Sequence, residues 1–154
     1  MKAVLLVLGL LLGGCSSSSD ATPPAAAPRP SADGRVTGTL AGTELRLEVA
    51  DDEQERSVGL MRRTSVPAGT GMVFLYGGEL SEGRYYMYDV PIPLRATFIR
   101  AGKVVSTVVM PPCRLDDPQA CPTYGAEGPY DTVVETDPSV APDPKPGDPF
   151  TLQG

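Results

Sequence analysis

Residues 85–99, YYMYDVPIPLRATFI, form the stretch that decides the fold. Aromatic and β-branched residues dominate it, and these residue types favour strands. Pro91 and Pro93 interrupt the run, and a proline ring fixes φ and removes the amide donor that a central strand needs. We therefore interpret the stretch as a strand over residues 84–89, a rigid elbow, and a second strand over residues 94–100.

Strand patterns continue on both sides of this stretch. Downstream, a turn at residues 101–102 leads into KVVSTVVM at residues 103–110, which predicts a hairpin. Upstream, Leu45, Leu47 and Val49 alternate with charged residues, as in a strand with one buried face. The chain is predicted to contain about seven or eight short strands, at residues 35–40, 44–49, 72–76, 84–89, 94–100, 103–110, 132–135 and 150–152.

One short helix is predicted near residues 52–61, DEQERSVGLM. Asp51 or Asp52 can cap its first turn, and the acidic residues that follow suit the positive end of the helix dipole. Val58 and Met61 are three residues apart, so the pattern places both side chains on the face toward the core.

The chain divides into a leader, a tether and one folded domain. Residues 1–14, MKAVLLVLGLLLGG, carry one positive charge and an apolar core too short to span a bilayer, which is typical of a signal peptide. Residues 12–15, LGGC, resemble the lipobox of bacterial lipoproteins, which implies that Cys15 becomes the mature N-terminus and carries acyl chains such as palmitate. Residues 15–34 are rich in Ser, Pro and Ala and predict a disordered linker. Residues 35–154 are predicted to form a single compact, mainly β (α+β) domain.

These features predict a location and a set of partners. We expect the lipid on Cys15 to anchor the protein to the outer face of the bacterial cytoplasmic membrane, or to the outer membrane if one exists. A net charge of −6 disfavours a nucleic-acid partner. Histidine, the commonest general base and metal ligand, is absent (His 0), and we expect no cofactor. A small molecule or an envelope polymer is the expected ligand.

Several short motifs follow one another in order along the domain. They are Ala50-Asp51, Gly59-Leu60-Met61-Arg62, Gly71-Met72-Val73-Phe74, Tyr86-Met87-Tyr88-Asp89-Val90, Ile92-Pro93-Leu94 and Phe98-Ile99. Together they resemble the domain of unknown function 192 (DUF192) family over about residues 45–152. Family members commonly carry Trp-Met-Lys-Asn-Thr where this chain has residues 86–90. The resemblance implies a compact β-rich fold, often in an exported protein, and implies no established activity.

Cys113 and Cys121 lie close together in the sequence, in the segment PCRLDDPQAC. In an exported chain, two such cysteines favour a disulfide. Their spacing is too long for a CxxC redox pair, and the lack of histidine argues against a zinc site. We therefore predict a structural disulfide between Cys113 and Cys121.

Four residues in and beside the opening stretch are candidates for ligand binding. Tyr86 and Tyr88 would share one face of a strand. Exposed aromatic rings beside the carboxylate of Asp89 suit a sugar or peptide ligand. Arg84 and Arg95 flank the segment and are candidates to orient an anionic or polar ligand. The alternative is that the tyrosines belong to the core and that Arg95 is a solvated charge at the end of a strand.

Two other functions stay open beside the leading prediction of a binding domain without catalysis. An envelope enzyme would use Asp89 with Arg or Glu partners, and a pair with Glu135 would suit acid–base or glycoside chemistry. A copper-binding protein would use thioethers, which select Cu(I). Each methionine of the domain lies in an apolar run, however, so core packing is the simpler interpretation. The methionines concerned are Met61, Met72, Met87 and Met110.

Overall fold

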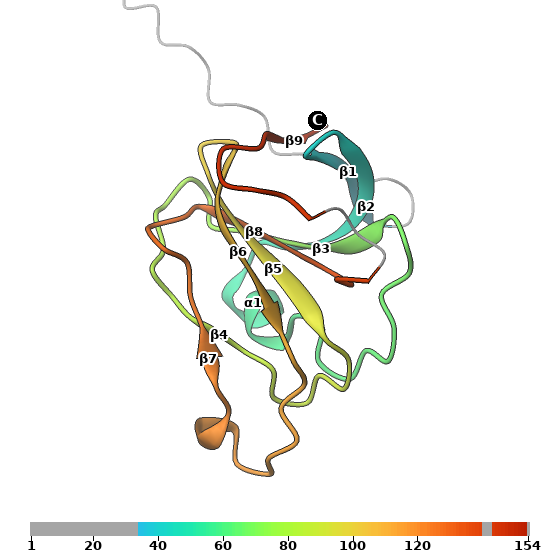
Figure 1. Cartoon of the computed structure of the whole chain (residues 1–154), viewed down its shortest axis with the longest axis vertical. Helices are drawn as coiled ribbons and strands as arrows, with labels where there is room; N and C mark the ends of the chain where they lie inside the picture. The colour runs from blue at the N-terminus through green and yellow to red at the C-terminus, as the bar shows by residue number, and fades with distance from the viewer. Residues whose placement is uncertain (1–33, 140–142, 154) are drawn as a thin grey trace, which may run out of the picture.

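The computed structural model describes residues 34–139 and 143–153. The predicted signal peptide, the lipid-bearing Cys15 and nearly all of the predicted linker lie outside these residues. The part described is a single compact domain, mostly β, with one short α-helix (Figure 1). The prediction of a mainly β fold is therefore confirmed. None of the helices in this part of the chain has the length and apolar character needed to cross a bilayer.

Seven strands form the main sheet, in the order β6-β5-β8-β3-β2-β1-β9, and β4 and β7 form a separate pair. The strands are β1 Arg35–Leu40, β2 Thr43–Ala50, β3 Thr70–Leu75, β4 Tyr85–Tyr86, β5 Leu94–Arg100, β6 Lys103–Met110, β7 Thr123–Tyr124, β8 Thr132–Thr136 and β9 Phe150–Leu152. Helix α1 spans Glu53–Val58, and the 3-10 helix η1 spans Pro118–Ala120. Strands β2 and β3 pair in parallel, so the chain must cross over between them, and α1 lies in that crossover.

The main sheet curls until its two edges meet. Strands β6 and β9 are the two edges, and hydrogen bonds join them. The Val104 amide at the start of β6 donates to the Asp148 carbonyl at 2.9 Å, and the Phe150 amide of β9 donates to the Gly102 carbonyl at 2.9 Å. Closing the edges in this way protects backbone groups that would otherwise be free to pair with another chain. The side chains inside the curl form one apolar core: Val36, Leu40, Leu45, Leu47, Val73, Ile99, Val104, Val134 and Phe150.

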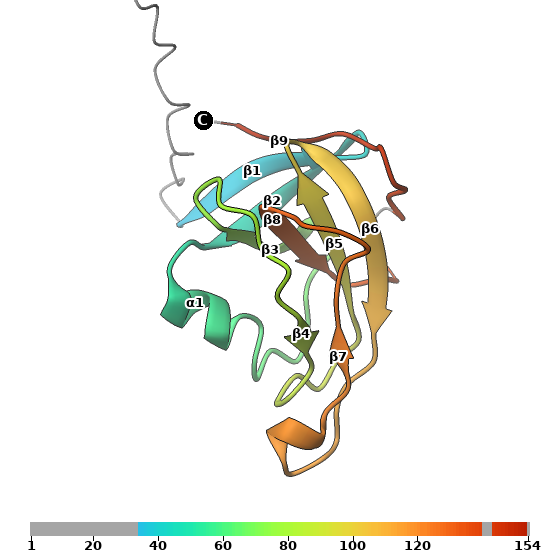
Figure 2. The same cartoon turned by 90° about the vertical axis from the view of Figure 1, so that its left-hand side faces the viewer.

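A second core lies on the other face of the sheet, beneath α1 and the β4–β7 pair (Figure 2). Strand β5 takes part in both cores, because residues alternate between the two faces of a strand. Phe98 of β5 packs in the second core, whereas Ile99 packs inside the curl. Consistent with this, six of the seven residues of β5 are buried, including the polar residues Arg95 and Thr97.

The strand predicted at residues 84–89 is wrong beyond Tyr86. Strand β4 has only the two-residue β7 as its partner, with Tyr85 opposite Tyr124. Asp89 adopts a φ of 57°, in the left-handed region, so the chain turns there instead of continuing as a strand.

The helix predicted at residues 52–61 is also too long. Asp52 caps it as expected, accepting from the Glu55 amide at 2.7 Å. Gly59 then adopts a φ of 47°, and a residue with positive φ at this position ends a helix. Val58 is consequently 53% exposed and does not face the core, contrary to the prediction, whereas Met61 packs against it.

Candidate functional site

A cavity of about 270 Å³ opens into the second core, between the sheet, α1 and β4. Its walls come from three parts of the chain, residues 56–61, 74–94 and 130–135. Figure 2 shows α1 and β4 on the same side of the curled sheet, which is the side where these parts meet. We call this cavity the Glu135 pocket, after the most buried charged residue in its wall.

Glu135 lies in β8 and is only 5% exposed. Its neighbours in register are Met72 of β3 and Ala96 of β5, and it shares the face of the sheet that carries Val133. No hydrogen bond or ion pair reaches its carboxyl group from elsewhere in the described part of the chain. Burial without a compensating donor or cation penalises the charged form, and this raises the pKa of Glu135 to about 8.

Aromatic rings form much of the wall around this acid. Phe74 and Tyr85 meet edge to face with their centroids 5.4 Å apart, and Tyr76 and Tyr130 do the same at 5.5 Å. The hydroxyls already have partners. The Tyr76 and Tyr85 oxygens are 3.0 Å apart, and the Tyr130 hydroxyl donates to the Gly83 carbonyl at 2.9 Å. Burial raises the pKa of Tyr85 and raises the pKa of Tyr130 to about 12, so both hydroxyls are neutral near pH 7.

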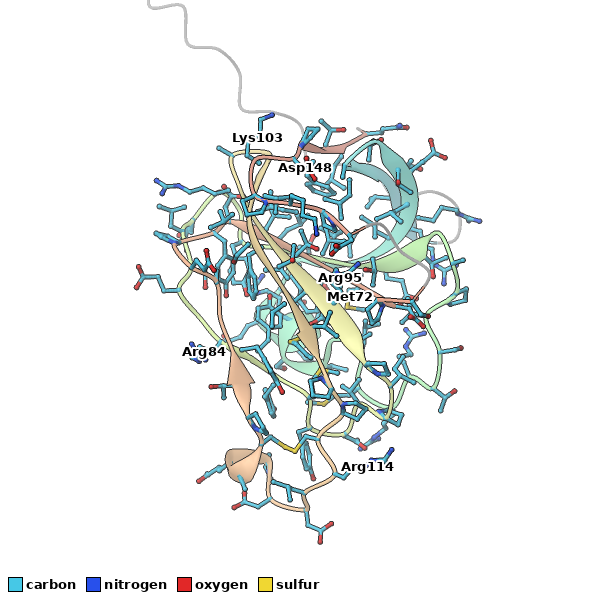
Figure 3. The ribbon with its side chains drawn as sticks, in the orientation of Figure 1. Met72, Arg84, Arg95, Lys103, Arg114 and Asp148 are labelled. Carbon is cyan, nitrogen blue, oxygen red and sulfur yellow. A yellow bond between two sulfur atoms is a disulfide. The ribbon has the colours of Figure 1, made fainter. Side chains whose placement is uncertain are left out.

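Two arginines lie at the outer part of the pocket. Arg56 Nη1 donates to the Leu75 carbonyl at 2.8 Å, and its guanidinium lies 5.0 Å from the centroid of the Tyr76 ring. Arg84 donates through Nε to the Thr123 hydroxyl at 2.8 Å and through Nη2 to the Thr123 carbonyl at 2.7 Å. Figure 3 shows Arg84 at the edge of the molecule beside β4. Neither guanidinium forms a salt bridge within the residues that the structure describes, so both positive charges are held in place by neutral groups.

Tyr86 and Tyr88 lie next to each other, and only Tyr86 lines the pocket. Their rings stack with centroids 6.5 Å apart and planes inclined by 11°, so the two tyrosines lie on one side of the segment, as predicted. Tyr86 is 41% exposed and lines the Glu135 pocket, whereas Tyr88 does not line it. The pair therefore offers a matched comparison between a ring inside the site and a ring beside it.

Asp89 and Arg95 lie away from the pocket. Asp89 accepts from Arg62 Nε at 2.8 Å, and each of the two residues lies in its own turn with a positive φ. Arg95 projects from β5 on the face opposite Ala96, with its Nη2 3.2 Å from a carboxylate oxygen of Asp143. Figure 3 places Arg95 over the sheet, well apart from Arg84. The four candidate ligand-binding residues are thus not brought together into one groove.

Glu135 entered the sequence analysis only as a partner for Asp89, and the two do not line the same cavity. The residue was nevertheless visible in the sequence, as an acid within the apolar strand TVVET at residues 132–136. When the alternation of a strand places an acid on the buried face, that acid is by itself a candidate for a functional site. What the sequence does not reveal is that Phe74, Tyr85 and Tyr130 surround it.

The methionines divide into two groups. Met61 and Met87 line the Glu135 pocket, whereas Met72 and Met110 are buried in the second core outside it. Clusters of three or more His, Cys, Asp or Glu that could hold a metal ion do not occur in residues 34–139 and 143–153. Thioethers from only two methionines therefore reach the cavity.

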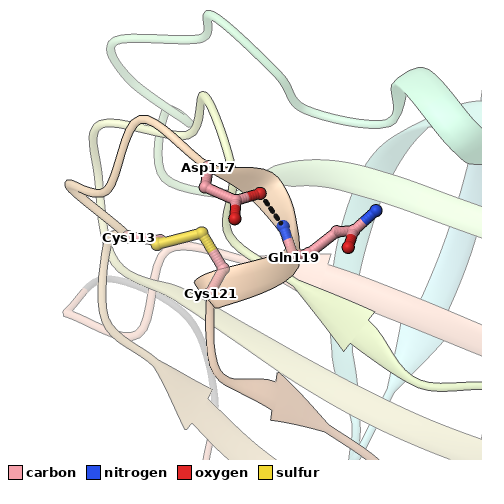
Figure 4. Close-up of a disulfide and its surroundings, with 4 residues drawn as sticks. All are labelled: Cys113, Asp117, Gln119 and Cys121. Atoms are coloured by element: carbon pink, nitrogen blue, oxygen red, sulfur yellow. Dashed lines mark hydrogen bonds between the residues drawn. A yellow bond between two sulfur atoms is a disulfide. The ribbon is translucent and has the colours of Figure 1, made fainter.

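The structure contains the predicted disulfide between Cys113 and Cys121. It lies at the base of the 3-10 helix η1, where the Asp117 side chain accepts from the Gln119 amide at 2.9 Å (Figure 4). The Cys113 amide donates to the Met87 carbonyl at 3.3 Å. The disulfide loop is therefore attached to the pocket wall at Met87 and continues into β7, the partner of β4.

Solved structures with a similar fold include the following two proteins. One is a protein of unknown function from Novosphingobium aromaticivorans DSM 12444, with 27% identity and a TM-score of 0.63 over 90% of this chain and 99% of that chain. The other, from Sinorhizobium meliloti 1021, is described as a candidate transcription regulator, with 24% identity and a TM-score of 0.63 over 77% of this chain and 92% of that chain. The second likeness is one of fold alone.

Comparison with curated proteins finds no match. A family model described as "Uncharacterized ACR" matches residues 36–148, which is most of the chain and contains the whole wall of the Glu135 pocket. The match agrees with the motif order from Ala50 to Ile99 that the sequence displays. The chain belongs to the DUF192 family.

Proposed function

We propose that the protein is a lipid-anchored, extracytoplasmic domain that binds a small ligand in the Glu135 pocket. The pattern of residues 1–14 and the LGGC sequence at residues 12–15 support export and anchoring through Cys15. One observation carries the binding proposal: a buried carboxyl group, without a partner among the residues that the structure describes, lies in the wall of an open, aromatic cavity.

An acid in this position works against folding. Burying an unpaired carboxyl group is unfavourable, and an apolar residue of similar size would suit the second core better. Buried groups with a strongly shifted pKa concentrate at functional sites, and small-molecule sites are mostly apolar cavities with a few polar groups. A ligand that contacts Glu135 would offset the cost of burying this carboxyl group and would explain why the cavity wall contains an acid.

The geometry gives less support to the other two functions. Asp89 is paired with Arg62 and lines a separate cavity of about 300 Å³, in which it is the only carboxylate among the described lining residues, so the acid pair with Glu135 is not formed there. Met61 and Met87 do reach the cavity, and copper(I) therefore belongs among the probes in a binding screen.

A ligand screen on the full chain in detergent tests the binding proposal. Ligand-observed NMR with sugars, peptidoglycan fragments, small amines, small acids and copper(I) should give hits. We expect Tyr86→Ala to weaken those hits roughly fivefold or more, because the lost ring lines the pocket. Tyr88→Ala, which removes the same type of ring outside the pocket, should leave them within about twofold. A screen without hits, or hits that respond equally to both variants, would contradict the proposal.

A further inference from the structure

The Glu135 pocket has an acid at its inner end and two bases at its outer end. Glu135 is 5% exposed and marks the inner end, whereas Arg84 is exposed and Arg56 is half-buried at the outer end. Neither arginine is paired with an acid in the described part of the chain, and Glu135 is not paired with a base. The cavity therefore presents a carboxyl group deep inside, which becomes negative when it ionises, and a positive site near its opening.

The wall between these sites is mainly aromatic and aliphatic. Tyr76 and Tyr85 bond to each other through their hydroxyls, and the Tyr130 hydroxyl is used on a backbone carbonyl. What remains are ring surfaces, the thioethers of Met61 and Met87, and aliphatic groups. A primary ammonium ion has three N–H donors that each need a partner, and besides Glu135 this wall offers only the oxygens of tyrosine hydroxyls that are already hydrogen-bonded. A methylated ammonium ion needs none, and aromatic rings are its usual surroundings.

We propose that the Glu135 pocket binds a small methylated ammonium compound that also carries an anionic group. The ammonium lies beside the Glu135 carboxylate among the rings of Phe74, Tyr85 and Tyr130, and the anionic group lies beside Arg56 and Arg84. This inference rests on the proposed function and names the class of ligand for the same site.

Several properties of the cavity agree with this ligand class. Its volume of about 270 Å³ is close to the lower limit of small-molecule sites, so it suits a compound of amino-acid size and not a polymer chain. A cation beside Glu135 favours the ionised carboxylate and offsets the penalty of burial, which by itself raises the pKa of this group. The guanidinium groups keep N–H donors beyond those already used by the Asp51 and Leu75 carbonyls and by Thr123, and these can reach an anion.

Two pairs of matched probes test the inference. Glycine betaine and 3,3-dimethylbutanoate have the same shape but differ in the ammonium charge, as do choline and 3,3-dimethyl-1-butanol. Binding is measured by calorimetry on the full chain at about pH 9, where the Glu135 carboxyl is mostly ionised. We expect each ammonium compound to bind at least about tenfold more tightly than its carbon isostere, and glycine betaine to bind more tightly than choline.

Variants assign these differences to particular residues. Glu135→Gln should weaken both ammonium probes about tenfold and leave the carbon isosteres unchanged, because only the ammonium interacts with the lost charge. Glu44→Gln, which removes the same charge from the exposed β1–β2 hairpin, should behave as wild type. Arg56→Gln should reduce the advantage of glycine betaine over choline without affecting choline itself.

The inference is overturned if the carbon isosteres bind as tightly as the ammonium compounds, or if Glu135→Gln binds all four probes like wild type. It is also overturned if choline matches glycine betaine, since the arginines would then have no role. If none of the four probes binds while other small molecules bind in a Tyr86-dependent way, the ligand class is wrong and the proposed function stands. If no small molecule binds at all, both fail.

Discussion

At the scale of single residues, Glu135 and Asp89 show how little a charge by itself says about function. Asp89 lies in a motif of the family, yet it is exposed and bonded to Arg62 at 2.8 Å, which makes it a turn residue. Glu135 lies in an unremarkable apolar strand, yet it is buried, unpaired in the described part of the chain, and surrounded by aromatic side chains. The surroundings of each acid, and not its residue type, decide its chemistry.

The stability of the protein should depend on pH through Glu135. Its pKa is about 8 in the folded state and near 4.5 when unfolded, so the folded state holds the proton more tightly between these values. The stabilisation of the folded state by this tighter proton binding is therefore fully present below about pH 4.5 and is lost as pH rises to about 8. Each pKa unit corresponds to about 1.4 kcal/mol, so the loss amounts to a few kcal/mol. Tyr85 and Tyr130 stay neutral over this range, because the pKa of each is raised.

Glu135→Gln removes this proton equilibrium while keeping the size of the side chain. In urea titrations at about pH 5 and about pH 8.5, the variant should lose less stability than wild type between the two conditions, and should be the more stable protein at the higher pH. Glu44→Gln, at an exposed position, is the control and should follow wild type. A parallel decline in wild type and Glu135→Gln would mean that Glu135 does not bind its proton more tightly in the folded state than in the unfolded state.

At the scale of elements, the sequence predicts strands well wherever a local pattern decides the outcome. Strands β5, β6 and β9 have the predicted bounds, because apolar alternation or a continuous apolar run is visible over the whole element. The two-residue strands β4 and β7 are a different case, since they exist only through pairing with each other. The parallel pairing of β2 with β3 likewise depends on a crossover that no local pattern displays.

The disulfide should support the β4–β7 pair more than the main sheet. Replacing both cysteines, in Cys113→Ala/Cys121→Ala, should lower the free energy of unfolding by about 2–3 kcal/mol for a loop of this length. Amide exchange at Tyr85 and Met87 should also become faster than exchange in β5, because the loop is attached to this wall of the pocket through Met87.

Reduced wild-type protein is the control for this experiment and should match the double variant in both urea unfolding and amide exchange. Uniform acceleration of exchange across β5 and β4 would show instead that the disulfide stabilises the whole domain and has no special connection to the pocket.

Gly71 should be essential to the pairing of β3 with β8. A Cβ at this position would overlap the carbonyl oxygen of Glu135, which is backbone and cannot move without separating the strands. Gly71→Ala should therefore destabilise the domain by about 3 kcal/mol. At Gly38 the nearest atoms are ends of the Leu47, Leu152 and Phe150 side chains, at 3.0–3.2 Å, so Gly38→Ala should be milder. Equal losses for the two variants in urea unfolding would contradict this difference.

At the scale of the whole molecule, the fold was more predictable than the site. The pocket combines residues 56–61, 74–94 and 130–135, which meet only because the sheet curls and α1 crosses over it. Tyr86 was a predicted ligand-binding residue and does line the pocket, whereas Arg95 lies on the opposite face of β5. Local alternation determines the face of a strand, but it does not determine which distant segments will cover that face.

The proposed attachment to a membrane depends on Cys15. We expect wild-type cells to incorporate labelled palmitate into the protein, and mass spectrometry to show a mature chain that begins at Cys15. Cys15→Ala should abolish the label, whereas Cys113→Ala/Cys121→Ala should keep it, because those two cysteines pair with each other. An unlabelled wild-type protein with an unprocessed N-terminus would contradict lipid anchoring.

The most direct test of the Glu135 pocket is to titrate the carboxyl carbon of Glu135 by ¹³C NMR in the folded, ligand-free protein. The resonance is identified as the one that Glu135→Gln removes. We predict a midpoint near pH 8, as expected for an acid that is buried without a partner. A midpoint near the ordinary value of 4.5 would show that the carboxyl group is solvated or paired, and the pocket would then lack the group on which ligand binding is proposed to depend.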